Sequence, residues 1–112
     1  MLNQPFSPAQ GQSQAVAVSS THTEIGIDSN AKQVRVLNPN AFPVYIRFFT
    51  SGNTQAATAP TVGTPGDYPI GPNSSEVVTK ADVFGGMSLV ADATKTGTVY
   101  VTPGEGFQSA AA

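Results

Sequence analysis

The side chains that could act in acid–base or nucleophilic catalysis are few. The chain has one histidine, His22, and no cysteine. A Ser-His-Asp triad would have to combine His22 with an acid such as Asp28 and one of the serines. The sequence has no Gly-x-Ser-x-Gly segment of the kind that exposes a nucleophilic serine on a sharp turn. We interpret His22, which lies between two threonines at the start of a strand-like run, as an exposed strand residue.

The carboxylates are the remaining candidates for acid–base chemistry or metal binding. They are Glu24, Asp28, Asp67, Glu76, Asp82, Asp92 and Glu105. A glycosidase needs two acids that face each other across a cleft, whereas these acids all lie near turns or strand ends. Calcium binds loop carboxylates, but no Asp-x-Asp-x-Asp pattern occurs. The short glycine pieces lack the lysine and the following helix of a phosphate loop. We therefore predict a protein that is not an enzyme, with no catalytic residue, cofactor or metal.

The composition describes a neutral surface. Only 11% of the 112 residues are charged, less than half of the usual quarter, and the formal net charge is -2. The five basic residues are scattered, so a nucleic-acid partner is not expected. No apolar run reaches the length of a membrane span, and the first residues do not resemble a signal peptide. We expect synthesis in a cytoplasm and a surface suited to packing in an assembly, although a threonine-rich β-protein would look similar.

Hydrophobic alternation with a period of two predicts the elements of the fold. Runs of this kind are rich in Val, Ile, Thr, Tyr and Phe, which is the strand signature. They span residues 14–19, 22–27, 33–38, 44–49, 68–70, 74–80, 86–91 and 98–102. The last run points Val99 and Val101 inward and is expected to stop at Pro103-Gly104. Residues 79–84 give the best helix signal, and it is at most one turn.

Eight short strands separated by turns predict an all-β fold. We favour an antiparallel sandwich that is jelly-roll-like, with an immunoglobulin-like sandwich as the alternative if seven strands form. The predicted domain covers residues 14–107. An extended N-terminal arm, 1–13, precedes it, and a C-terminal tail, 108–112, follows it. Val44, Ile46 and Phe48 are expected on one face of their strand. The self-association candidates lie on second faces: Tyr45, Arg47, Phe49 and Tyr100. Alternatively, they fill a second layer of the sandwich.

The long loop at residues 50–67 has no charge before Asp67 and no alternation. Loops of this length inside a compact domain tend to be functional or disordered. Its Ala, Thr and Pro content favours an extended segment that lies against another protein. The alternative is a floppy surface loop.

Four segments carry a resemblance to a known class of proteins. In order, they are Val34-Arg-Val-Leu-Asn38, Val44-Tyr-Ile-Arg-Phe48, Asp67-Tyr-Pro-Ile-Gly-Pro-Asn-Ser-Ser-Glu76 and Thr98-Val-Tyr-Val-Thr-Pro-Gly-Glu-Gly-Phe107. Together they resemble small virion structural proteins of tailed bacteriophages. The resemblance covers residues 33–107, with a gap at the long loop.

Among those proteins, the capsid cement (decoration) proteins of short-tailed phages are of similar size. The resemblance implies a jelly-roll-like domain on the outer capsid surface of the virion, often a homodimer, which clamps neighbouring subunits of the major capsid protein. In such a role the arm, the loop and the tail would contact the shell. The capsid-contact candidates are Leu2, Phe6, Asn53, Thr54, Gln55, Pro60, Val62, Pro65 and Phe107.

Two other functions remain open at the level of sequence. A neck, tail or fibre-base component would have nearly the same features and would differ in copy number. A carbohydrate-binding host-attachment module would use Tyr45, Tyr68 or Tyr100 to stack on sugars. The absence of tryptophan makes a sugar platform less persuasive.

Overall fold

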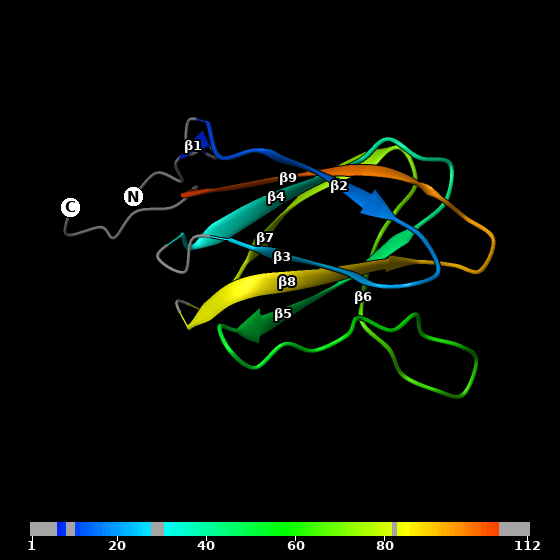
Figure 1. The fold of residues 1–112 in the computed structure, drawn as a ribbon. Coiled ribbons are helices and arrows are strands. Elements are labelled where there is room, and N and C mark those ends of the chain that lie inside the picture. The colour runs from blue at the N-terminus through cyan, green and yellow to red at the C-terminus, as the bar shows by residue number, and fades with distance from the viewer. Residues whose placement is uncertain (1–6, 9–10, 28–30, 82, 106–112) are drawn as a thin grey trace.

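The structure is a computed structural model, which describes residues 7–8, 11–27, 31–81 and 83–105. Two antiparallel sheets pack face to face as a β-sandwich, and the described residues contain no helix (Figure 1). The all-β sandwich predicted from the alternation is confirmed. Three predicted features, Leu2, Phe6 and the segment from 106 to 112 that contains Phe107, lie outside the described residues.

The first sheet, sheet A, is built around the last strand of the chain. In this sheet β9 (Gly97–Glu105) pairs on one side with β4 (Gln33–Asn38), which in turn pairs with β7 (Ser74–Thr79). The other side of β9 is shared end to end by β1 (Ser7–Pro8) and β2 (Gln14–Val18). Part of the predicted arm is therefore a strand of the sheet.

The second sheet, sheet B, has the order β3 (Thr23–Gly26), β8 (Phe84–Ala91), β5 (Val44–Thr50) and β6 (Tyr68–Ile70). All of its pairings are antiparallel. β1 and β2 both pair with β9, and the next strand, β3, lies in the other sheet. In an immunoglobulin-like sandwich the first two strands share one sheet, so the observed order differs from that alternative when β1 and β2 are counted as one interrupted strand.

The strand that closes the chain runs further than its turn residues predict. β9 continues through Pro103 and Gly104, which pair with Val34 and Gln33 of β4. Proline has no N–H to donate, so it is tolerated where a ladder is interrupted. On the other side of β9, Pro103 lies at the interruption between β1 and β2. The prediction that Pro103-Gly104 stops the strand was therefore wrong. The helix signal at 79–84, which predicts at most one turn, coincides with the connection between β7 and β8, where the Phe84 N–H donates to the Ala81 carbonyl oxygen at 3.2 Å.

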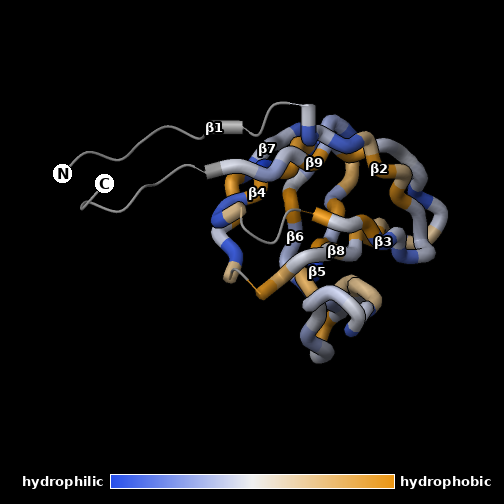
Figure 2. Tube along the Cα trace, turned by 60° about the vertical axis from the view of Figure 1, so that its left-hand side comes forward, coloured by the Kyte–Doolittle hydropathy of each residue, from blue (hydrophilic) through white to orange (hydrophobic). Residues whose placement is uncertain are grey.

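The core between the sheets follows the predicted alternation. Sheet A contributes only valines to the buried cluster, whereas sheet B adds larger side chains. Hydrophobic positions recur along the strands of both sheets (Figure 2). The buried cluster consists of Val16, Val18, Val34, Val36, Val44, Ile46, Ile70, Met87, Leu89, Ala91, Val99 and Val101. A dry core of this kind supplies most of the free energy of folding for a domain of this size.

A buried amide ties one end of the sandwich together. Asn38 ends β4 and points inward, and its residue is fully buried. Its Nδ2 donates to the carbonyl oxygens of Phe42, Ile70 and Gly71 at 2.8, 3.2 and 3.1 Å. Its Oδ1 accepts from the backbone N and the Nδ2 of Asn40. The inward position at the strand end is thus polar because the β4–β5 connection and the end of β6 with the residue after it present carbonyl groups there that need a donor.

Replacing Val99 by Asp is expected to unfold the domain, because an unpaired carboxylate would be buried in the core. The matched control is Tyr100→Asp on the same strand. Tyr100 points to the opposite face and is 44% exposed, so this variant is expected to fold. Circular dichroism and urea unfolding measure the difference. A folded Val99→Asp protein with unchanged stability would contradict the assigned core.

Candidate functional site

The outer face of sheet B is covered by the chain's own long loop. Tyr45 of β5 and Val90 of β8 are register partners on this face. They form a second small cluster with Ala57, and Ala59 packs against it; Tyr45 is only 9% exposed. The loop residues therefore cover the outer face of sheet B, as sheet A covers its inner face. As a result, β8 is buried from Gly86 to Ala91 on both of its faces.

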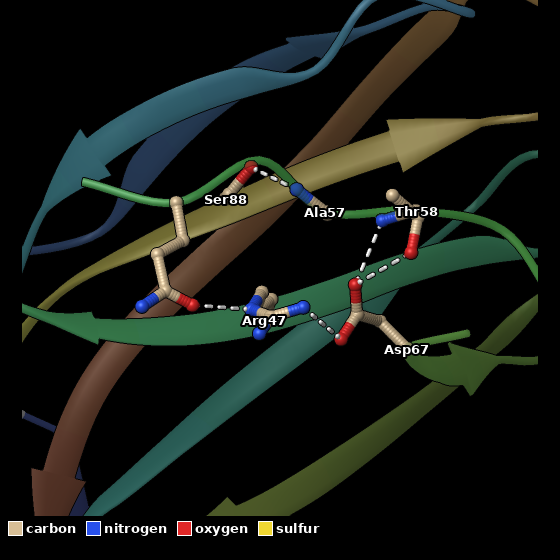
Figure 3. Close-up of polar contacts among 6 residues, drawn as sticks. Arg47, Ala57, Thr58, Asp67 and Ser88 are labelled. Carbon is tan, nitrogen blue, oxygen red and sulfur yellow. Dashed lines mark hydrogen bonds and ion pairs between the residues drawn. The ribbon is translucent and has the colours of Figure 1, made fainter. Parts of the chain in front are cut away.

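A buried hydroxyl fixes the loop to the middle of the sheet. Ser88 of β8 is fully buried, and its Oγ accepts a hydrogen bond from the backbone N–H of Ala57 at 2.8 Å (Figure 3). This bond satisfies a loop N–H that would otherwise be buried without a partner, which costs about 1–3 kcal/mol. This hydrogen bond explains why a serine occupies the middle of a strand whose other buried residues are apolar or glycine.

A carboxylate closes the base of the loop. Asp67, the last loop residue, accepts hydrogen bonds at Oδ2 from the backbone N and the Oγ1 of Thr58, at 2.7 and 3.3 Å. The Asp67 N–H in turn donates to the Thr58 carbonyl oxygen at 2.8 Å. The two ends of the segment 58–67 are therefore joined by three hydrogen bonds, and the carboxylate faces inward toward the base (Figure 3).

Arg47 links this base to the sheet. Its Nη1 lies 3.4 Å from Asp67 Oδ1, and its Nε donates to Gln55 Oε1 at 2.9 Å. Exposed ion pairs contribute about 0–1 kcal/mol, and the Arg47 side chain is 42% exposed. The pair therefore adds little to the free energy of folding. Its main effect is that the two opposite charges lie together and offset each other at the base of the loop.

The distal part of the loop, residues 59–66, is a small hairpin with a hydrophobic tip. Thr61 and Thr64 exchange backbone hydrogen bonds at 3.0 and 2.9 Å around Val62 and Gly63. Gly63 has φ 84°, a backbone conformation that strains other residues. A Cβ on Gly66 would overlap the backbone of Pro60, so the two arms of the hairpin touch below the tip. Val62 itself projects into solvent, with 106% of its reference area exposed.

The structure divides the predicted capsid-contact residues of the loop into two groups. Gln55 is half-buried and holds Arg47. The others are exposed: Asn53, Thr54, Pro60, Val62 and Pro65. The loop therefore does not face outward along its whole length, because Ala57 and Ala59 pack on the chain's own sheet while residues 51–54 and 60–66 are exposed.

The predicted self-association residues are also divided. Phe49 is 7% exposed and packs over Gly86, where a Cβ would overlap its ring. Like Tyr45, it fills a second layer on the outer face of sheet B and is covered by this chain. Arg47 and Tyr100 are exposed. They lie on outer faces of different sheets, so the structure does not bring the four residues together.

Sequence reasoning did not identify Ala57, Thr58, Asp67 and Ser88 as parts of one network. Two signals were present. Asp67 is the only charged residue of the loop, and Ser88 interrupts an apolar strand. Neither signal names its partner, because the contacts depend on where the loop crosses the sheet.

The structure gives no cluster of metal-binding side chains among the residues that it describes. No group of three or more His, Cys, Asp or Glu side chains lies close enough together to hold a metal ion there. His22, just before β3, has its Nε2 2.8 Å from Oε2 of Glu24 on β3, and the pair is partly exposed. Within the described ranges, no helix has the length and apolar character to cross a membrane.

Comparisons of the chain with protein-family models, with curated proteins and with solved structures found no match.

Replacing Asp67 by Ala is expected to release the loop without unfolding the domain. The free energy of unfolding should fall by about 1 kcal/mol, because only hydrogen bonds at a partly exposed site are lost. Hydrogen exchange should show that the amides of residues 57, 58 and 67 lose protection while those of β4 and β9 do not. The control is Glu24→Ala, which removes an acid from an exposed pair on the same sheet. Unchanged exchange of the Thr58 amide in Asp67→Ala would show that the Asp67 carboxylate does not hold the base of the loop.

Tyr45 makes stability sensitive to alkaline pH. Burial, the negative charge of Asp92 and a hydrogen bond to Asp92 raise the pKa of Tyr45 above 10.0. The folded state therefore keeps this proton more tightly than the unfolded state. The stabilising contribution is present below pH of about 10 and is lost as the pH rises through the folded pKa.

The expected result is that the free energy of unfolding of Tyr45→Phe falls less steeply above pH of about 10 than that of the unaltered protein. Chemical denaturation at a series of pH values measures it, with the exposed Tyr100→Phe as control. Equal slopes for the unaltered protein and Tyr45→Phe would show that Tyr45 does not titrate as described.

Proposed function

We propose that this protein is a non-enzymatic capsid decoration protein, which binds the outside of a phage head and clamps neighbouring subunits of the major capsid protein. The observation that carries the proposal is the long loop. A mobile loop would be a poor clamp, whereas this loop is anchored at Ser88 and at Asp67 and holds an uncharged hairpin away from the sandwich. A protein that works by contact needs such a fixed, projecting element.

The strand order supports the same proposal. When β1 and β2 are counted as one interrupted first strand, sheet A has the order first, eighth, third, sixth, and sheet B has the order second, seventh, fourth, fifth. We interpret this order as that of a jelly roll, a double sheet of eight strands with two Greek keys that occurs in viral capsid domains. Fold alone does not specify function. The strand order is therefore a second line of support for the proposal, and the loop remains the main one.

The proposed mechanism is mass action on the shell. Many copies that bind only the mature, expanded shell stabilise that state by their binding free energy. The low charge of the chain, 11% of residues, limits repulsion between crowded copies. We propose a homodimer, so that two loops reach the shell together and a modest affinity per loop gives long retention. Arg47 and Tyr100 are the exposed self-association candidates.

The alternatives have less support. A tyrosine platform for sugars is not assembled, because Tyr45 is buried and Tyr68 Oη donates to Glu76 Oε1 at 2.6 Å. A neck, tail or fibre-base component remains an alternative that differs in copy number, so quantitative mass spectrometry of whole particles would distinguish the two.

The direct test is reconstitution with heads that lack this protein. The purified chain should bind expanded heads saturably, in many copies per head, and should raise the temperature at which the heads release their DNA. It should not bind the unexpanded precursor shell. The same thermal resistance with and without the protein, or binding of only a few copies at one vertex, would refute the decoration role.

A further inference from the structure

The feature with no role inside the molecule is the side chain at the apex of the hairpin. Six large hydrophobic residues are exposed among the described residues, and Val62 is the most exposed of them; Val83 follows at 64%. An isolated exposed valine is ordinary on a protein surface. Val62 differs because a hydrogen-bonded turn with a glycine at positive φ holds it away from the sandwich. Pro60 and Pro65 flank this turn.

We propose that Val62 is the anchor of the shell contact and that it enters an uncharged, apolar pocket on the major capsid protein. This inference rests on the proposed decoration function and names the chemistry of its binding surface. Few residues carry most of the energy of an interface, and they are those that fill a pocket.

The geometry favours an anchor because it is organised before binding. The Thr61–Thr64 hydrogen bonds hold the turn, and the Asp67–Thr58 bonds hold its base. Ordering a flexible segment at an interface costs free energy that is subtracted from affinity. A hairpin that is already ordered avoids most of this cost, so even one small apolar side chain contributes measurably.

The charges indicate what kind of pocket the tip fits. Residues 50–66 contain no charged side chain. The nearest charges of the clamp, Arg47 and Asp67, lie together at the base. A partner surface with unpaired charge would lose its hydration against this tip and gain no counter-charge. The fitting partner is therefore apolar and uncharged, and its affinity for the tip depends little on salt.

The test measures binding of the purified full-length chain to expanded heads that lack it, at low occupancy and at low and high salt. Val62→Ala should weaken binding about tenfold, as expected for two methyl groups leaving a pocket. Val62→Thr, which keeps the shape and adds a hydroxyl, should weaken it similarly. Val83→Ala is the matched control, an exposed valine outside the loop, and should bind as the unaltered protein does. Thermal melts confirm that every variant is folded.

Each outcome has a distinct meaning. If the unaltered protein binds and Val62→Ala binds equally well, or if Val83→Ala weakens binding as much, this inference is wrong while the decoration role stands. If binding falls steeply with salt, the uncharged pocket is wrong. If Val62→Ala changes the oligomeric state measured by light scattering and leaves shell binding unchanged, the tip contacts a second copy and the inference is overturned. Failure of the unaltered protein to bind refutes the proposed function and this inference with it.

Discussion

The constraint on which this structure depends is that sheet B carries apolar side chains on both faces. Its inward residues meet the valines of sheet A, but Tyr45 and Val90 point the other way and also need to leave water. A second layer must therefore cover them, and the chain supplies it from the segment that joins β5 to β6. The length of that loop, the buried N–H of Ala57 and the hydroxyl of Ser88 all follow from this requirement.

The course of the loop at residues 50–67 has two consequences: it covers the outer face of sheet B, and it presents an exposed tip. The loop lies on the sheet up to Ala59, leaves it as a hairpin and returns at Asp67, where the carboxylate joins the departing and returning strands. The free energy that fixes the base comes from burial and from hydrogen bonds to the backbone. The exposed tip therefore does not have to contribute to stability and is available for a partner. This separation of base and tip is one reason for the proposal that the protein works by contact.

The alternation of Val, Ile and Leu with polar residues was enough to place β2 to β9, but not β1. Residues 33–38 and 68–70 have the predicted bounds. Along 33–38 the predicted face is buried, because a one-residue shift would turn every buried side chain outward. Local signals failed where tertiary contacts decided. Pro103 looks like a stop and lies within a strand, since the opposite ladder is interrupted there. Tyr45 and Phe49 look like surface residues, since the residues that cover them are distant in sequence or, like the loop, carry no periodic pattern.

The central claim is that the loop is a rigid part of the fold up to its tip. Backbone order parameters from ¹⁵N relaxation test it most directly. The account predicts values near those of the core strands, about 0.85, for residues 57, 58, 61 and 64. Values below about 0.6 at these positions would show a flexible loop, and neither the anchored base nor the pre-organised tip would then describe this protein.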